Sequence, residues 1–153
     1  MTTTEMQNLT VQVYQVFIKA TPEQIWDAIT NPEFTQKYFY GSRIESSFEP
    51  GEPYEGFSGD RSEKLVDGEV LEASPPSKLV TTWRALYDAE TAKEPHSRVS
   101  WEIEPAGDGI VQLTVVHDGL EAAPKTAENV AGGWSYVLSG LKTVLETGSP
   151  LSG

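Results

Sequence analysis

The sequence AENVAGGWSYVLSGLKTVLE, residues 127–146, has the apolar spacing of a long helix but contains Gly132, Gly133 and Gly140. Its apolar residues recur at intervals of three and four, which places them on one helical face. A helix of roughly 20 residues is about 30 Å long, enough to cross a strongly curved sheet. Gly133 and Gly140 lie one heptad apart on one flank, where each costs about 1 kcal/mol relative to alanine. We therefore expect that flank either to pack very close to a strand or to leave room for a ligand beside Trp134. The alternative is that the GG pair marks a bend and the helix begins near Trp134.

The start of the chain predicts one strand followed by two short helices. Residues 9–18 alternate in hydrophobicity and are rich in β-branched and aromatic residues, which indicates the strand. TPEQIWDAI and NPEFTQKYF follow it, and each begins with a capping residue, Thr21 or Asn31, before a proline. Proline is well tolerated at the first position of a helix, so both stretches predict helix starts.

The middle of the chain, residues 42–118, changes to a period of two with Gly, Pro and Asp at short intervals. This pattern is typical of an antiparallel meander. Six more strands are expected, at about 42–48, 53–58, 63–73, 78–86, 96–105 and 109–118. Together with the first strand they predict an α+β fold, in which a strongly curved seven-stranded antiparallel sheet is covered on its concave face by the C-terminal helix.

Size and composition restrict the possible functions. The 153 residues predict one domain, with a core at about 9–147 and frayed ends at 1–8 and 148–153. A net charge of −12 disfavours a nucleic-acid partner, because phosphate binding requires clustered Lys and Arg. The absence of cysteine excludes disulfides and thiolate catalysis. No stretch approaches the ~20 apolar residues that span a bilayer, and no leader pattern is present, so we expect a cytoplasmic protein that does not insert into membranes.

Four stretches carry a resemblance to a known family. They are, in chain order, IKATPEQIWDAITNPE, GEVLEASPPSKLVTTW, VQLTVVHDGL and GGWSYVLSGLKTVL. With them the chain resembles the START-like helix-grip (SRPBCC) superfamily, which includes the birch-pollen allergen and polyketide cyclases. Within it, the chain is similar to the family named after the activator of heat-shock protein 90 ATPase. The resemblance implies a single START-like domain over residues 1–153 and a cavity between sheet and helix, which the superfamily uses for lipids, plant metabolites and polyketides.

Strand alternation indicates which residues would line such a cavity. Side chains two apart share a face of a strand, which groups Val99 with Trp101 and Val115 with His117. The predicted ligand-binding residues are Tyr38, Tyr54, Trp83, Trp101, Val115, His117, Trp134 and Leu138. Tyr38, Tyr54 and Phe57 are expected at the mouth. Three inward indoles either fill the layer solidly or form an aromatic pocket, and the sequence leaves both open.

His117 and Tyr38 are the candidates for polar chemistry in this set, and His117 lies where the family also carries a histidine. Its imidazole either faces the cavity and polarises a ligand, or bonds to backbone at the end of its strand. His96, at the end of an acidic loop, is expected to be exposed. Arg43, Arg61 and Arg84 are expected to pair with surface acids.

Three functions follow. The favoured one is a binding module for a small hydrophobic or aromatic molecule. The alternatives are a co-chaperone-like domain with a chaperone or other protein partner, and an enzyme of the cyclase or aromatase kind. No catalytic or phosphate-binding motif is present, and the two histidines have no metal-site spacing, so we expect no catalytic residue, no metal and no cofactor.

Overall fold

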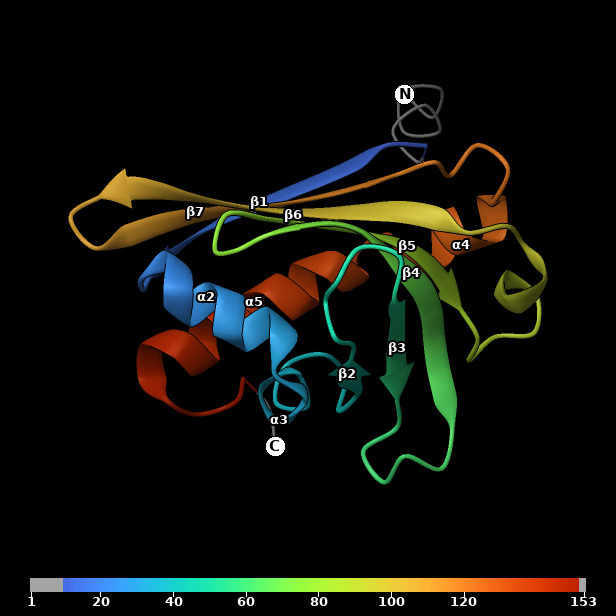
Figure 1. Ribbon diagram of the computed structural model, residues 1–153, viewed down its shortest axis with the longest axis horizontal. Helices are drawn as coiled ribbons and strands as arrows, with labels where there is room; N and C mark the ends of the chain where they lie inside the picture. Colours follow the sequence, from blue (N-terminus) through green and yellow to red (C-terminus); the bar gives the residue numbers. More distant parts are fainter. Residues whose placement is uncertain (1–9, 152–153) are drawn as a thin grey trace.

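Seven antiparallel strands form one sheet in the computed structural model, which describes residues 10–151 (Figure 1). The order across the sheet is β1-β7-β6-β5-β4-β3-β2. Strands β2 to β6 therefore each pair with the next strand in sequence, whereas β1 pairs with β7 and lies at the opposite edge from β2. The strands are β1 (Gln12–Lys19), β2 (Arg43–Glu45), β3 (Pro53–Phe57), β4 (Lys64–Ser74), β5 (Lys78–Ala85), β6 (Ser97–Gly107) and β7 (Ile110–Asp118). All seven strands and the α+β helix-grip architecture predicted from the sequence are confirmed. The prediction for residues 1–8 lies outside the described residues, as does that for 152–153.

Register shifts curve the sheet. They occur between β3 and β4 at Gly56/Phe57, between β4 and β5 at Val70/Glu72, and between β6 and β7 at Pro105/Gly107. Each inserts an extra residue on one strand, which bends it and increases its twist. The sheet therefore forms a trough around the helices on its concave side (Figure 1).

Two short helices follow β1, as predicted. α2 (Pro22–Thr30) begins at Thr21, whose hydroxyl accepts from the Gln24 backbone N–H while the Gln24 side chain accepts from the Thr21 N–H. This reciprocal pair satisfies two of the helix's unpaired donors. α3 (Pro32–Thr35) is only one turn long. The residues after it, including Tyr38 and Phe39, therefore lie in turns rather than on a helix.

The C-terminal helix is interrupted, and the continuous helix predicted over 127–146 is wrong. α4 (Pro124–Val130) ends at Ala131, and α5 (Gly133–Thr147) begins after Gly132, whose φ is +85°. A left-handed residue stops the helical hydrogen-bond ladder, and glycine adopts this conformation without steric cost. The alternative that GG marks a bend is thus confirmed. Gly148, which the prediction placed in a frayed end, ends α5, with its N–H bonded to the Val144 carbonyl.

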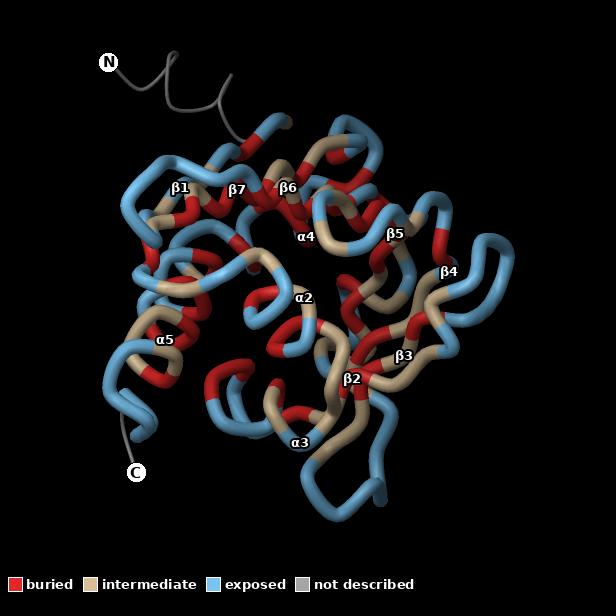
Figure 2. Tube along the Cα trace, turned by 60° about the vertical axis from the view of Figure 1, so that its left-hand side comes forward, coloured by how far each residue is buried: buried red, intermediate tan, exposed pale blue. Residues whose placement is uncertain are grey.

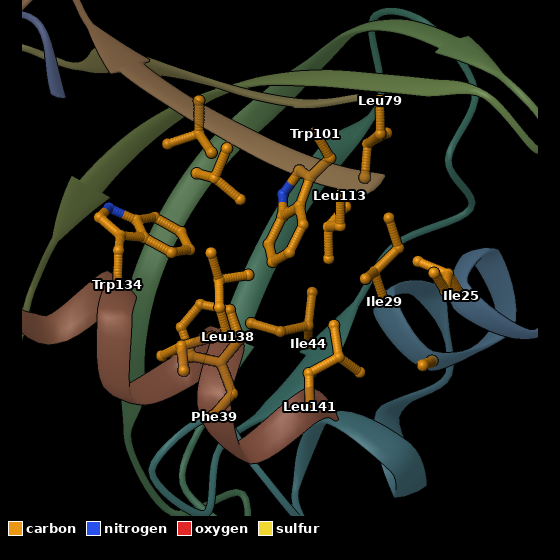
Figure 3. Packing of buried hydrophobic residues seen from close by; sticks show 14 of the residues in the cluster. Ile25, Ile29, Phe39, Ile44, Leu79, Trp101, Leu113, Trp134, Leu138 and Leu141 are labelled. Carbon is orange, nitrogen blue, oxygen red and sulfur yellow. The ribbon is translucent and has the colours of Figure 1, made fainter. Parts of the chain in front are cut away.

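Between sheet and α5 lies the hydrophobic core (Figures 2 and 3). The predicted inward faces of the strands are buried, to 0–4% exposure, at Leu79, Thr81, Trp83, Val99, Trp101, Ile103, Val111, Leu113, Val115 and His117. Figure 3 shows Trp101 reaching from the sheet and Trp134 reaching from α5 into the same layer. A short 3-10 helix, η1 (Thr91–Lys93), lies in the connection between β5 and β6. Within residues 10–151, no helix has the length and apolarity needed to cross a bilayer.

Candidate functional site

A cavity of about 370 Å³ lies beside the interruption between α4 and α5. Its wall comes from the turns after α3, from β4 and β5, from the loop after β5, and from both sides of the helix break. The lining residues are Phe39, Tyr40, Ser42, Leu65, Val66, Trp83, Tyr87, Asn129, Val130, Gly133, Trp134 and Val137. The volume lies within the range of roughly 300–1,000 Å³ that is usual for small-molecule sites.

Aromatic rings form the inner wall. The Phe39 ring centroid lies 6.0 Å from that of Trp83, 6.5 Å from that of Trp101 and 5.7 Å from that of Trp134. Phe39 is stacked on Trp83 with an interplanar angle of 23°, and meets Trp134 edge-on at 75°. Such offset and edge arrangements are favourable for aromatic pairs and suit a flat apolar ligand equally well.

The outer wall is polar but uncharged. Tyr40 and Tyr87 are 64% and 53% exposed, which locates the mouth of the cavity. The Tyr87 hydroxyl donates to the Asn129 Oδ1 in a short hydrogen bond, and the Tyr40 ring stacks on Tyr136 at 5.0 Å. No Asp, Glu, Lys or Arg is among the lining residues. The cavity therefore combines an apolar interior with hydroxyl and amide groups at its mouth.

His117 is hydrogen-bonded to Trp134 and forms part of a chain of hydrogen bonds that ends at the Trp83 carbonyl. The Trp134 indole N–H donates to His117 Nδ1 at 3.0 Å, and His117 Nε2 is 2.6 Å from the Ser97 Oγ. Because an indole nitrogen can only donate, His117 Nδ1 must accept, which assigns the imidazole proton to Nε2. Nε2–H then donates to Ser97, whose hydroxyl donates to the Trp83 carbonyl at 3.3 Å. Both imidazole nitrogens are thereby used within the protein.

Electrostatics keep this histidine neutral. His117 has no exposed surface, and burial lowers its pKa to about 4, against a smaller opposite effect of the Asp118 carboxylate. Burial disfavours a charged imidazole because it removes the water that would solvate it. At neutral pH His117 is a neutral link between α5 and the sheet.

Several buried polar atoms have no partner among residues 10–151. They include Trp83 Nε1, Trp101 Nε1 and Thr81 Oγ1. Buried donors without acceptors are rare and costly in folded proteins. Trp83 also lines the cavity, whereas Trp101 and Thr81 do not.

The charged groups pair outside the cavity. Arg84 donates from Nε and Nη2 to the two carboxylate oxygens of Asp67, at 3.1 and 2.8 Å. His96 Nε2 lies 3.1 Å from the same carboxylate. Burial raises the pKa of Asp67, but the neighbouring Arg84 and His96 together outweigh it, so the pKa of Asp67 is lowered. Arg43 and Arg61 both contact Glu45, so the predicted surface pairing of these arginines is confirmed. His96 is exposed, as expected, but it is paired with Asp67. Among the described residues no cluster of His, Cys, Asp and Glu could hold a metal ion.

Of the predicted site residues, Trp83 and Trp134 line the cavity. Trp101 and His117 contact Trp134 from behind, at ring distances of 5.6 and 5.9 Å. Val115 and Leu138 are buried in the core and are not among the lining residues.

The tyrosines predicted at the mouth do not lie there. Tyr38 and Tyr54 are 3% and 1% exposed, and the Tyr38 hydroxyl donates to the Ala28 carbonyl at 2.8 Å. Burial raises the pKa of both phenols. Phe57 is not a lining residue either and packs under the Arg61 guanidinium at 4.7 Å. The mouth is formed instead by Tyr40 and Tyr87, which the sequence reasoning missed.

The two flank glycines have different surroundings. A Cβ added to Gly140 would lie 3.1 Å from the Cβ of Tyr38, whereas one added to Gly133 would meet only the Tyr40 hydroxyl, at 3.6 Å. Gly140 thus permits close packing, but against the turn after α3 rather than against a strand. Gly133 lines the cavity, as the alternative of room beside Trp134 required.

The sequence profile described as Activator of Hsp90 ATPase homolog 1-like protein matches residues 19–146. The chain belongs to this family. The match to the Activator of Hsp90 ATPase homolog 1-like family extends from the last residue of β1 to the last turn of α5, and it includes every lining residue of the cavity. No curated protein has a significantly similar sequence.

Solved structures share the family's fold. One is PFC0360w, an HSP90 activator from Plasmodium falciparum, with a TM-score of 0.72 and 20% identity over 90% of this chain and 96% of that one. Protein MLL2253 from Mesorhizobium loti has a TM-score of 0.72 and 22% identity, over 89% and 96%. The Aha1 dimer from Colwellia psychrerythraea has a TM-score of 0.70 and 18% identity, over 90% and 97%. At these identities the likeness establishes the fold alone.

Proposed function

We propose that this protein binds a small, uncharged, hydrophobic or aromatic molecule in the cavity beside the α4–α5 break. The observation that carries the proposal is a cavity of about 370 Å³ walled by Phe39, Trp83 and Trp134 and free of charged side chains. A charged ligand would lose its hydration there without gaining a partner, which is costly. An apolar ligand would instead gain roughly 25 cal/mol for each Å² that it buries.

The geometry favours binding over catalysis. A general base needs a free lone pair within reach of the substrate. Both nitrogens of His117 are engaged, with Trp134 and with Ser97, and Tyr38 donates its proton to a backbone carbonyl. The polar groups at the mouth, Tyr40, Tyr87 and Asn129, are hydrogen-bonding groups that orient a ligand.

A cavity-filling pair of variants tests this proposal. Leu65 and Leu71 both lie on β4, but Leu65 lines the cavity whereas Leu71 is 45% exposed away from it. Titration with tetralin, a small bicyclic hydrocarbon, is expected to quench or shift tryptophan fluorescence in the wild type and in Leu71→Trp. Leu65→Trp should abolish the response, since the added indole occupies the cavity. Equal binding by both variants would contradict the proposed location.

The natural ligand can be sought directly. Native mass spectrometry of the purified protein, followed by organic extraction, should reveal a co-purifying neutral compound in the wild type and much less of it in Leu65→Trp. A compound retained equally by Leu65→Trp would place its site elsewhere.

Membership in the Activator of Hsp90 ATPase homolog 1-like family supports a second candidate, a co-chaperone-like interaction with an Hsp90. The structural neighbour from Plasmodium falciparum is described as an HSP90 activator. The test is the ATPase rate of an Hsp90 with and without this protein. Stimulation that persists in Leu65→Trp would favour the interaction role, because that role does not need the cavity.

A further inference from the structure

We propose that the ligand carries an uncharged hydrogen-bond acceptor, such as a ketone oxygen, which receives the indole N–H of Trp83 after the Phe39 ring moves aside. This inference rests on the proposed binding function and deepens it.

The first observation is the unpaired donor in the wall. Trp83 is 4% exposed and lines the cavity, yet its Nε1 has no acceptor among the described residues. The indole of Trp134, beside it, is satisfied by His117. A buried N–H without a partner costs about 1–3 kcal/mol, and a ligand oxygen that accepts from it would recover part of that cost. A hydrocarbon of the same shape would not.

A second observation concerns how the donor is covered. Trp83 Nε1 is fully shielded in the structure, so a ligand reaches it only if a neighbour moves. The Phe39 ring is stacked on Trp83 at 6.0 Å, and Phe39 lies in a turn rather than on a strand or helix.

The backbone next to Phe39 supports such a movement. Tyr40 and Gly41 follow it with φ values of +54° and +75°, two consecutive left-handed residues. A bulky residue with positive φ is conformationally strained, and such residues cluster at ligand clamps and switch regions. Tyr40 also stacks on Tyr136 at the mouth, so one turn carries both an inner ring and an outer ring of the cavity. A shift of this turn would move the Phe39 ring off the Trp83 ring and open the mouth together.

The chemical class of the acceptor follows from the surroundings. No cation lines the cavity, so a carboxylate would be buried without a counter-charge. Ketone, ester and ether oxygens accept hydrogen bonds without carrying charge. The ligand is therefore a neutral carbonyl- or ether-bearing aromatic or alicyclic molecule, with its oxygen at Trp83.

Tetralin and 1-tetralone provide the test, because they differ only in a CH₂ or C=O group in one ring. We expect 1-tetralone to bind the wild type about three- to tenfold more tightly, which is the effect of one net hydrogen bond. In ¹H–¹⁵N spectra the indole proton of Trp83, assigned from the Trp83→Phe variant, should move downfield with 1-tetralone and not with tetralin.

Trp83→Phe and Trp101→Phe form the matched pair of variants. Each removes a buried indole N–H that has no partner, but only Trp83 lines the cavity. Trp83→Phe should bind both probes equally, whereas Trp101→Phe should keep the preference for 1-tetralone. Equal binding of both probes by the wild type, or loss of the preference in both variants, would overturn this inference and leave the proposed function standing. Failure of the wild type to bind either probe would remove both.

The displacement of Phe39 has its own readout. Phe39→Ala is expected to strengthen binding of 1-tetralone, because the ligand no longer has to move the ring, and Phe39→Leu gives the same test with a smaller loss of buried surface. Weaker binding by both variants would show that Phe39 is a fixed part of the wall and would overturn the displacement step.

Discussion

Leu141, in the second half of α5, lies in the packed core with Leu138 and Ile44 (Figure 3). Trp134, at the start of α5, instead lines a cavity with aromatic walls. The same helix therefore does two things. Gly140 lets α5 approach the turn at Tyr38, while Gly133, one heptad earlier, faces the cavity. The cavity therefore lies beside the interruption of the C-terminal helix, where Gly133 has no side chain to fill the space.

The largest expected difference between the two ends concerns stability. Leu141 has no exposed surface, and Leu141→Ala should lower the free energy of unfolding by about 2–5 kcal/mol, because a cavity forms in a closely packed region. Leu65→Ala, at the wall of a cavity that already exists, should cost less. Urea denaturation of both variants measures the difference, and equal losses would contradict a distinction between the ends.

Acid should lower the free energy of unfolding through His117, which lies beside Trp134 at the cavity end of α5. Burial lowers the pKa of His117 to about 4, below the value of ~6.5 in an unfolded chain. The unfolded state therefore binds the extra proton first, so the contribution is fully present above pH ~6.5 and falls as the pH drops towards about 4, by on the order of 3 kcal/mol in total.

His117→Gln isolates this contribution. Glutamine can accept from Trp134 but does not titrate, so its free energy of unfolding should change less between pH 6.5 and 4 than that of the wild type. Parallel pH profiles for the two proteins, measured by urea denaturation at several pH values, would show that His117 is not the group responsible.

The indoles of Trp134 and Trp83, whose ring centroids lie 5.6 Å apart, should differ in what their N–H groups contribute to stability. Trp134→Phe leaves His117 Nδ1 buried without its donor and should cost about 1–3 kcal/mol. Trp83→Phe removes an N–H that has no partner in the structure and should be close to neutral. Thermal unfolding followed by circular dichroism compares them, and a larger loss for Trp83→Phe would refute the assigned hydrogen-bond chain.

The smallest effects are expected at the two glycines, and they should have opposite signs. Gly140→Ala places a methyl group 3.1 Å from the Tyr38 Cβ, and Tyr38 is held by its bond to Ala28, so the strain should outweigh the gain in helix propensity by about 1 kcal/mol. Gly133→Ala has room and should stabilise by about 0.4–1 kcal/mol. A stabilising Gly140→Ala would mean that the packed end yields more easily than its contacts indicate.

The sheet and its inward face were predictable because a strand has a fixed period. Alternation placed Trp83, Trp101 and His117 on one side, and all three are buried there. The capping residues Thr21 and Asn31 likewise marked their helix starts correctly. These features depend on neighbours in sequence, which local rules describe well.

The mouth of the cavity was not predictable in this way. Phe39, Tyr40 and Tyr87 lie in turns, where side-chain direction depends on backbone angles such as the φ of +54° at Tyr40. No periodicity reports those angles. The helix break was visible only as an alternative, because Val130 and Trp134 keep the spacing of four across Gly132, although the helix does not continue.

The break at Ala131 and Gly132 also has a use in protein engineering. Both residues are exposed, and the two helices that meet there each contribute to the cavity wall through Val130 and Trp134. Exposed, small residues between elements tolerate insertion well. Adding one or two residues at this point would reposition α4 against an unchanged α5, so the volume of the cavity could be varied without redesigning the sheet or the packed core.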